Sequence, residues 1–168
     1  MKYLLGLCFA ALFSTAVTAG EPAAKAGESA GLNQMVVKMQ LAKDVSMDDA
    51  VESMKLRANL LNMKLVAELP LSKQVEAMTG KTERRIAIYQ FCDALTAKQM
   101  VDYSMDFAAW LPCRIALVED EKGKGWLVML DLNVLINVAN LNPKLKELAI
   151  GVRSNLESIM KAGANGEL

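Results

Sequence analysis

Alternation of apolar and polar residues predicts a chain built around five strands. Residues 35–42 alternate with a period of two, which is typical of a strand with one buried face. The same pattern, or a short apolar run, predicts four more strands at residues 65–71, 84–92, 113–118 and 126–132. Pro70 lacks an amide donor, so the second strand should lie at an edge or contain a bulge.

The third predicted strand carries apolar residues on both faces. Ile86 and Ile88 would point one way, and Ala87, Tyr89 and Phe91 the other. A strand of this kind is usually central in its sheet and covered on both sides. We therefore expect protein to pack against each face of residues 84–92.

Helical spacing of apolar residues predicts three to four helices. Ser46 has the sequence of an N-cap, with acidic residues in the first turn, and its helix should run to about Asn62. Residues 93–111 favour a helical connection. It should break at Tyr103-Ser104, because Ser104 can cap a second short helix that would bury Phe107 and Trp110.

The last helix should begin at Asn142-Pro143, because proline is tolerated in a first helical turn. Residues 133–141 are apolar with three asparagines and favour no single element. Together these patterns predict a two-layer α+β fold of mostly antiparallel strands in the order β-α-β-β-α-β-β-α. The single domain should span residues 35–162, with a frayed tail at 163–168.

The first 34 residues have the composition of an export signal and a linker. Residues 1–19 contain Lys2, an apolar run and a final Val17-Thr18-Ala19, as in a secretory signal peptide. Residues 20–34 are small and polar, and we expect a flexible linker. After cleavage we expect a periplasmic or secreted protein with no transmembrane segment, in an oxidising compartment.

Composition excludes several classes of function. The chain has no histidine, so it cannot form a Ser-His-Asp or Cys-His nucleophile system. Its formal net charge is +0, which leaves no basic excess to neutralise nucleic acid phosphates. No phosphate-binding loop or nucleophile motif is present. We therefore expect a non-enzymatic protein, and place hydrolytic or oxidoreductase catalysis third among the functions considered.

Cys92 and Cys113 form the main chemical constellation. They would lie at the end of one strand and the start of the next. If the connection between them is a two-helix return, the cysteines can meet; if it is a single parallel crossover, their separation exceeds the roughly 7 Å between Cα atoms that a disulfide allows. A structural disulfide, buried free thiols and a functional thiol or metal site all remain open.

Methionines extend this constellation. Met100 and Met105, with Met129, could join the two thiols as soft ligands for Cu(I), which prefers sulfur donors. The competing interpretation is that the methionines fill the core, because others in the chain follow strand or helix periodicity. The sequence requires no cofactor, and copper is the one metal that it suggests.

Three further residues are candidates for ligand or interface contacts. Trp110 and Trp126 have the size and amphipathic character of core or interface anchors. Arg114 could pair with the acidic run Glu119-Asp120-Glu121, which has the composition of a solvated hairpin tip. The spacing of these acids does not match a calcium loop.

The middle of the chain resembles the domain-of-unknown-function family numbered 302. The resemblance rests on the strand Ile86–Cys92, the run Leu111-Pro112 with Ile115–Val118 after it, the acidic hairpin Glu119–Gly123 and the strand Trp126–Leu130. Where many members have Asn-Pro after the central strand, this chain has Cys92-Asp93. The resemblance implies a two-layer α+β fold and a homodimer, and it implies no settled activity.

These observations favour an exported small binding or interaction module, partnered by a second copy or by another exported protein. The alternative is a periplasmic thiol-redox or copper-handling protein that uses Cys92 and Cys113.

Overall fold

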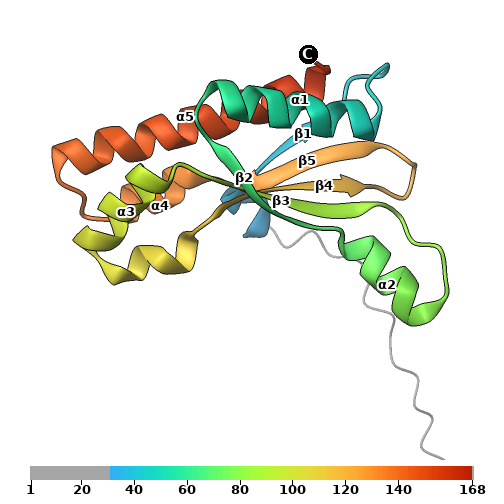
Figure 1. Ribbon diagram of the computed structural model, residues 1–168, viewed down its shortest axis with the longest axis horizontal. Coiled ribbons are helices and arrows are strands. Elements are labelled where there is room, and N and C mark those ends of the chain that lie inside the picture. The colour runs from blue at the N-terminus through green and yellow to red at the C-terminus, as the bar shows by residue number, and fades with distance from the viewer. Residues whose placement is uncertain (1–30, 168) are drawn as a thin grey trace, which may run out of the picture.

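The computed structural model describes residues 31–167 (Figure 1). The predicted signal peptide, residues 20–30 of the predicted linker and Leu168 lie outside the described residues. The rest of the predicted linker enters a short 3-10 turn, Leu32–Met35, which leads directly into the first strand. No helix within residues 31–167 has the length and apolar character needed to cross a bilayer.

One antiparallel sheet of five strands forms the centre of the protein. The strands are β1 (Val36–Gln40), β2 (Lys64–Leu69), β3 (Ile86–Cys92), β4 (Cys113–Glu119) and β5 (Gly125–Leu130). Their spatial order is β1-β5-β4-β3-β2, and every neighbouring pair is antiparallel. The predicted α+β class and strand number are confirmed. β2 is an edge strand with an irregularity between Leu65 and Ala67, as the proline after it indicated.

The described chain has five α-helices, so the predicted number of three to four and the predicted order of elements are wrong. The helices are α1 (Met47–Leu60), α2 (Leu71–Thr79), α3 (Ala94–Tyr103), α4 (Leu132–Val138) and α5 (Pro143–Asn165), with a 3-10 helix η2 (Met105–Trp110) after α3. α2 and α4 are the missed helices. α2 is largely polar and exposed, so little of its sequence signals burial, and α4 is rich in asparagine.

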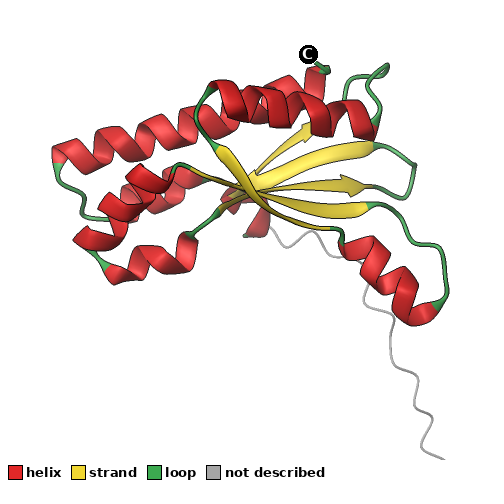
Figure 2. Ribbon diagram, viewed as in Figure 1, coloured by secondary structure: helices red, strands yellow, loops and turns green. Residues whose placement is uncertain are grey.

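α1 and α5 lie side by side across one face of the sheet and form the second layer (Figures 1 and 2). The core between the layers is apolar and includes Phe91, Leu127, Leu156 and Ile159, which are all buried. Ser46 caps α1 as predicted, because its hydroxyl oxygen accepts a hydrogen bond from the amide of Asp49 at 3.0 Å.

The predicted frayed tail from residue 163 onward is wrong. α5 continues to Asn165, and Gly163 is buried against α1. A Cβ atom at Gly163 would collide with Met54 and Leu127, so glycine permits the close contact of the two helices there. Beyond the helix, Glu167 pairs with Arg57 of α1 at 2.7 Å.

The opposite face of the sheet is not covered by α1 or α5, and we call it the open face. It carries the outward side chains of the strands, among them Ile86 and Ile88, which are half-buried. The expectation that residues 84–92 are covered on both sides is therefore wrong for the described chain. α2 and η2 project at the two ends of the sheet, on the side away from α1 and α5 (Figure 1).

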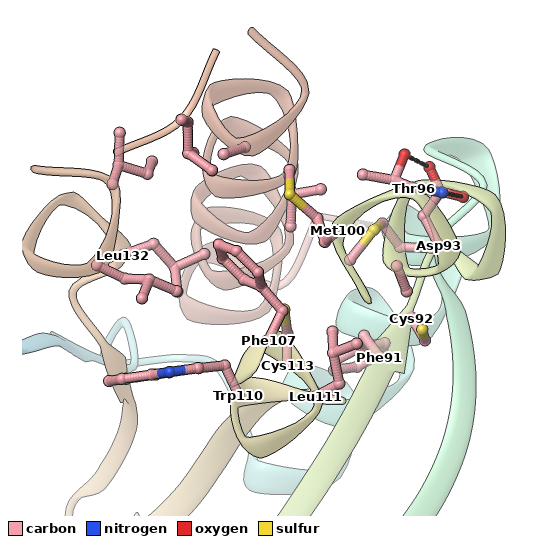
Figure 3. A pocket seen from close by; sticks show the side chains of 17 residues that line it. Phe91, Cys92, Asp93, Thr96, Met100, Phe107, Trp110, Leu111, Cys113 and Leu132 are labelled. Carbon is pink, nitrogen blue, oxygen red and sulfur yellow. Dashed lines mark hydrogen bonds between the residues drawn. The ribbon is translucent and has the colours of Figure 1, made fainter. Parts of the chain in front are cut away.

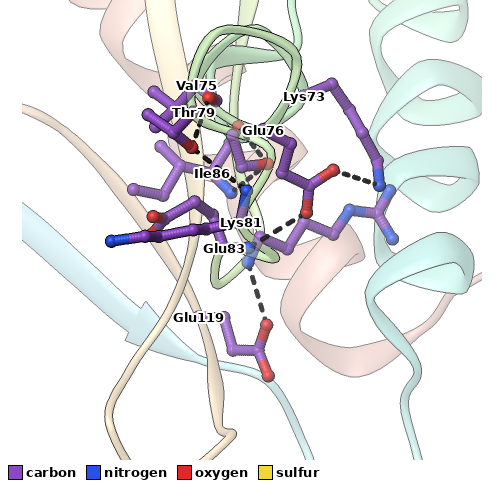
Figure 4. Close-up of polar contacts among 10 residues, drawn as sticks. Lys73, Val75, Glu76, Thr79, Lys81, Glu83, Ile86 and Glu119 are labelled. Atoms are coloured by element: carbon purple, nitrogen blue, oxygen red, sulfur yellow. Dashed lines mark hydrogen bonds and ion pairs between the residues drawn. The ribbon is translucent and has the colours of Figure 1, made fainter.

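Polar contacts hold α2 in place although its surface is mostly exposed (Figure 4). The carboxylate of Glu76 pairs with Lys73 at 2.9 Å and accepts a hydrogen bond from the amide of Glu83 at 3.1 Å. The Lys73 ammonium, and then the Glu83 amide, lower the pKa of Glu76. Ser72 exchanges hydrogen bonds with the backbone of Ile86 at the start of β3. α2 is thus a projecting helix with a defined position.

Candidate functional site

A pocket opens at the end of the sheet where β3 stops and β4 begins (Figure 3). α3 and η2 form one wall, and α4 and α5 form the other. Its floor is made by the strand ends, with Phe91 and Cys113 as neighbours in register. The cavity has a volume of about 70 Å³.

Two helix N-caps, Asp93 and Ser104, position the wall formed by α3 and η2. The carboxylate of Asp93 accepts hydrogen bonds from the amides of Leu95 at 3.1 Å and Thr96 at 3.3 Å, which starts α3 directly after the strand. Ser104 then ends α3 and caps η2 through the amide of Asp106 at 3.3 Å. This break turns the chain back, so β4 runs antiparallel to β3. The predicted two-helix return with a break at Tyr103-Ser104 is confirmed.

The second wall is fixed by caps and by contacts between helices. Asp131 caps α4 through the amide of Asn133 at 2.9 Å. Arg153 of α5 donates to the side-chain oxygen of Asn133 at 2.7 Å, which joins α5 to α4. The two walls meet where the hydroxyl of Tyr103 donates to the backbone carbonyl of Asn140 at 2.5 Å. That bond connects the end of α3 to the loop between α4 and α5.

The pocket surface is almost entirely apolar. The polar side chains in its lining are Asp93 and Thr96, and they bond to each other through the threonine hydroxyl at 2.7 Å. The apolar and sulfur-bearing lining comprises Met63, Phe91, Cys92, Ala97, Met100, Phe107, Trp110, Leu111, Cys113, Leu132, Leu135, Ile136, Leu141, Ala149 and Val152. A surface of this kind favours uncharged, apolar molecules.

Cys92 and Cys113 lie at the same end of the sheet, but both are free thiols. Cys113 pairs in register with Phe91, so it shares the face covered by the helices, whereas Cys92 is one residue further along β3 and leaves from the opposite face. Burial, and then the nearby Cys92, raise the pKa of Cys113 to about 11. Burial, and then Asp93, raise the pKa of Cys92. Both thiols are therefore protonated at neutral pH, which disfavours nucleophilic chemistry.

The pocket unites four of the residues singled out in the sequence: Cys92, Met100, Trp110 and Cys113. Met105 is not among them, because it is 80% exposed on η2. Trp110 is 41% exposed, so the prediction that the short helix buries it is wrong, whereas Phe107 does line the pocket.

Arg114 of β4 and Trp126 of β5 lie on the open face, and neither residue lines the pocket that contains Cys92 and Cys113. The indole nitrogen of Trp126 donates to the Asp120 carboxylate at 3.0 Å, and Asp120 also accepts from the amides of Lys122 and Lys124. Asp120 thereby organises the acidic hairpin. Within residues 31–167 no cluster of three acidic or cysteine side chains is arranged to hold a metal ion.

Sequence reasoning missed part of the pocket. Met63 lies in the loop before β2 and showed no periodic signal. Leu132, Leu135 and Ile136 come from α4, whereas the sequence pattern predicts Leu132 as the end of the fifth strand and favours no single element for the other two. Their spacing of three and four residues is the helical signal that could have identified this wall.

Comparison with known proteins identifies the family and shows the fold. The model of the family described as "Domain of unknown function DUF302" matches residues 37–163. The crystal structure of an uncharacterized conserved protein DUF302 from Bacillus stearothermophilus is similar, with a TM-score of 0.65 and 14% identity. The match covers 76% of this chain and 97% of that chain. No curated protein matches. The chain thus belongs to the DUF302 family.

Proposed function

We propose that this protein is an exported, non-enzymatic module that binds a small, uncharged, apolar molecule in the pocket between α3–η2 and α4–α5. The observation that carries the proposal is the lining itself, where the polar groups of Asp93 and Thr96 satisfy each other and leave apolar and sulfur atoms to meet a ligand. The raised pKa values of the two thiols support a binding role rather than a nucleophilic one.

The volume of the pocket limits the size of the ligand that it can hold. Its volume of about 70 Å³ is about half of the ~150 Å³ that holds benzene in an engineered apolar cavity. A molecule of benzene size enters only if a wall moves outward. The bond between Tyr103 and Asn140 is the contact that joins the two walls at the α4–α5 loop, so ligand binding should displace this loop.

The two tryptophans allow a direct test. Trp110 lines the pocket and Trp126 lies on the open face, so the Trp126→Phe variant keeps Trp110 as the sole tryptophan. Titration with toluene or hexane should shift the emission of Trp110 and saturate, whereas benzoate should not bind. Failure of every uncharged probe to give a saturable change would contradict the proposal.

A matched pair of variants on α5 locates the site. Val152→Phe adds volume inside the pocket and should abolish toluene binding, because Val152 is part of the lining. Ile150→Phe adds the same kind of ring at a position 38% exposed on the same helix, and binding should persist. Equal loss in both variants would place the binding site elsewhere.

Export is a separate part of the proposal. It rests on the charged, apolar and small-residue segments of residues 1–19. Expression with a C-terminal tag, followed by cell fractionation and N-terminal sequencing, should give a periplasmic or secreted protein that begins at Gly20. A cytosolic protein that retains Met1 would overturn this part alone.

A second candidate function is soft-metal binding, because four sulfur-bearing residues, Met63, Cys92, Met100 and Cys113, contribute to one lining, although the two thiols leave the sheet from opposite faces. Cu(I) prefers such ligands, and its binding would release the thiol protons. Anaerobic competition against a coloured Cu(I) chelator should then show binding that is lost in Cys92→Ser/Cys113→Ser and kept in Met105→Leu. Cu(I) binding that persists in the double cysteine variant, or no Cu(I) binding by the native protein, would rule out this candidate.

A further inference from the structure

The open face carries a compact apolar block at its centre. Register places Ile86 beside Val118 and Val118 beside Trp126 in one row. A second row holds Ile88, Ala116 and Val128, also in register. All six side chains lie on the face that α1 and α5 leave uncovered, and none is fully buried. A contiguous apolar surface of this kind, rimmed by polar residues, indicates a protein interface.

The charges around the block are arranged with opposite signs at its two ends. Along β4 the middle of the block falls between Ala116 and Val118; Arg114 lies two residues before Ala116, and Asp120, just beyond the strand, lies two residues after Val118. Asp120 is turned toward the open face, because its carboxylate holds the indole of Trp126. Among the described residues, no carboxylate lies within ion-pair distance of Arg114.

We propose that a second copy of this chain packs on the open face, sheet against sheet, with its strands running in the opposite direction. A two-fold axis across the strands at the centre of the block places each apolar row over the other row. The same operation places Arg114 of each copy over Asp120 of the other. The alternative axis, along the strands, would bring the two Arg114 side chains together, which like-charge repulsion disfavours.

The two projecting elements fit the same arrangement. α2 leads into β3 beside Ile86, and η2 leads into β4 at the other end of the sheet. Reversal of the strands therefore brings α2 of one copy to η2 of the other. Each carries an exposed apolar side chain, with Met78 of α2 87% exposed and Trp110 of η2 41% exposed.

The available area is consistent with a dimer that needs these projections. Five strands about 4.8 Å apart and about 20 Å long give a footprint of roughly 500 Å². Stable interfaces bury about 800 Å² on each partner. α2 and η2 therefore have to supply the remainder, which their positions at the two ends of the sheet allow. This inference is independent of the ligand proposed for the pocket.

The first test is the mass of the purified protein in solution as its concentration is varied. Sedimentation should show a dimer that dissociates on dilution, and the tryptophan emission of the native protein should shift to the red over the same concentration range. Ala116→Glu, at the centre of the block, should be monomeric by sedimentation, and its circular dichroism spectrum should show that it is folded. A native protein that is monomeric at 100 μM, or a folded Ala116→Glu variant that stays dimeric, would overturn the proposal.

A charge cycle tests the direction of packing with substitutions that leave the core intact. Arg114→Glu should raise the dissociation constant of the dimer at least tenfold, because it sets the new carboxylate of each copy opposite Asp120 of the other. Adding Asp120→Asn should restore part of this loss, whereas Lys161→Glu, a charge reversal on exposed α5 surface, should have no effect. Tighter association of Arg114→Ala would instead indicate the arrangement that brings the two arginines together, and would refute the antiparallel packing.

Discussion

Gly163 of α5 lies so close to Ala50 of α1 that a Cβ atom built on the glycine would stand 3.0 Å from the backbone oxygen of Ala50. The same atom would be 2.6 Å from the Cγ atom of Met54, inside any normal contact distance. The spacing of the two helices that cover the sheet is therefore set by the missing side chain at this position. Either helix must shift, at a cost to the core, if the glycine is replaced.

We predict that Gly163→Ala lowers the free energy of unfolding by about 1–3 kcal/mol, the usual range for an overpacked core. Urea denaturation followed by circular dichroism measures this. The control is Gly151→Ala on the same helix, where nothing lies within 4 Å of the added atom. That variant should gain up to about 1 kcal/mol from helix propensity. Equal effects of the two substitutions would contradict the packing argument.

Burial of the Cys113 thiol predicts a loss of stability in alkali. Its pKa is raised from 9.0 to about 11 in the folded protein, chiefly by burial. The unfolded chain therefore loses this proton first as the pH rises above 9, so stability is fully present below pH 9 and falls between pH 9 and 11, by up to roughly 3 kcal/mol.

Urea denaturation at several pH values measures the slope. Cys113→Ala should lose that part of the slope while keeping the contributions of lysines and tyrosines. A slope that is unchanged by the substitution would show that Cys113 ionises in the fold as it does in the unfolded chain.

The contact between Asp120 and Trp126 predicts a fluorescence change in acid. The amide of Lys124, and then the indole of Trp126, lower the pKa of Asp120 from its ordinary value of 3.8. The stabilisation that this carboxylate gives the hairpin is thus present above pH 3.8 and is lost as the pH falls through the lower folded pKa. In the Trp110→Phe variant the emission of Trp126 should titrate with a midpoint below 3.8. Asp120→Asn in that background should abolish the titration; a midpoint above 3.8 would disprove the direction of the shift.

Removal of the Tyr103 hydroxyl should loosen the pocket. Tyr103→Phe deletes the hydrogen bond to Asn140 that joins its two walls, at a cost of about 1 kcal/mol. Amide hydrogen exchange should accelerate in residues 132–142 and remain unchanged in β3 and β4. Apolar probes should also enter and leave faster. Unchanged exchange in this segment would mean that the bond does not hold the wall.

The strands and the turn that forms the pocket could be predicted because local patterns determine them. A period of two marks residues 36–40, and Ser104 has the chemistry that ends one helix and caps the next. The antiparallel return of β4 follows from that break, and so does the placement of Cys92 and Cys113 at one end of the sheet.

The register could not be predicted, and it decides what the thiols can do. Pairing of Cys113 with Phe91, rather than with Cys92, sends the two side chains to opposite faces, and no local pattern distinguishes a shift of one residue. Met63 reaches the pocket from a loop, so its role depends on tertiary packing alone. The apolar side chains of Ile86 and Ile88 indicated a second covered face, which the described chain does not provide and a second copy would.

The backbone of Ala42, just after the first strand, donates a hydrogen bond to Ala164, near the C-terminus, at 2.8 Å. Leu156, Ile159 and Met160 of the same final helix complete the core. The sheet therefore cannot receive α5, one of the two helices that cover it, until Asn165 has been synthesised. If the chain is exported as we propose, this late closure would keep it unfolded during synthesis and delay folding until it has crossed the membrane.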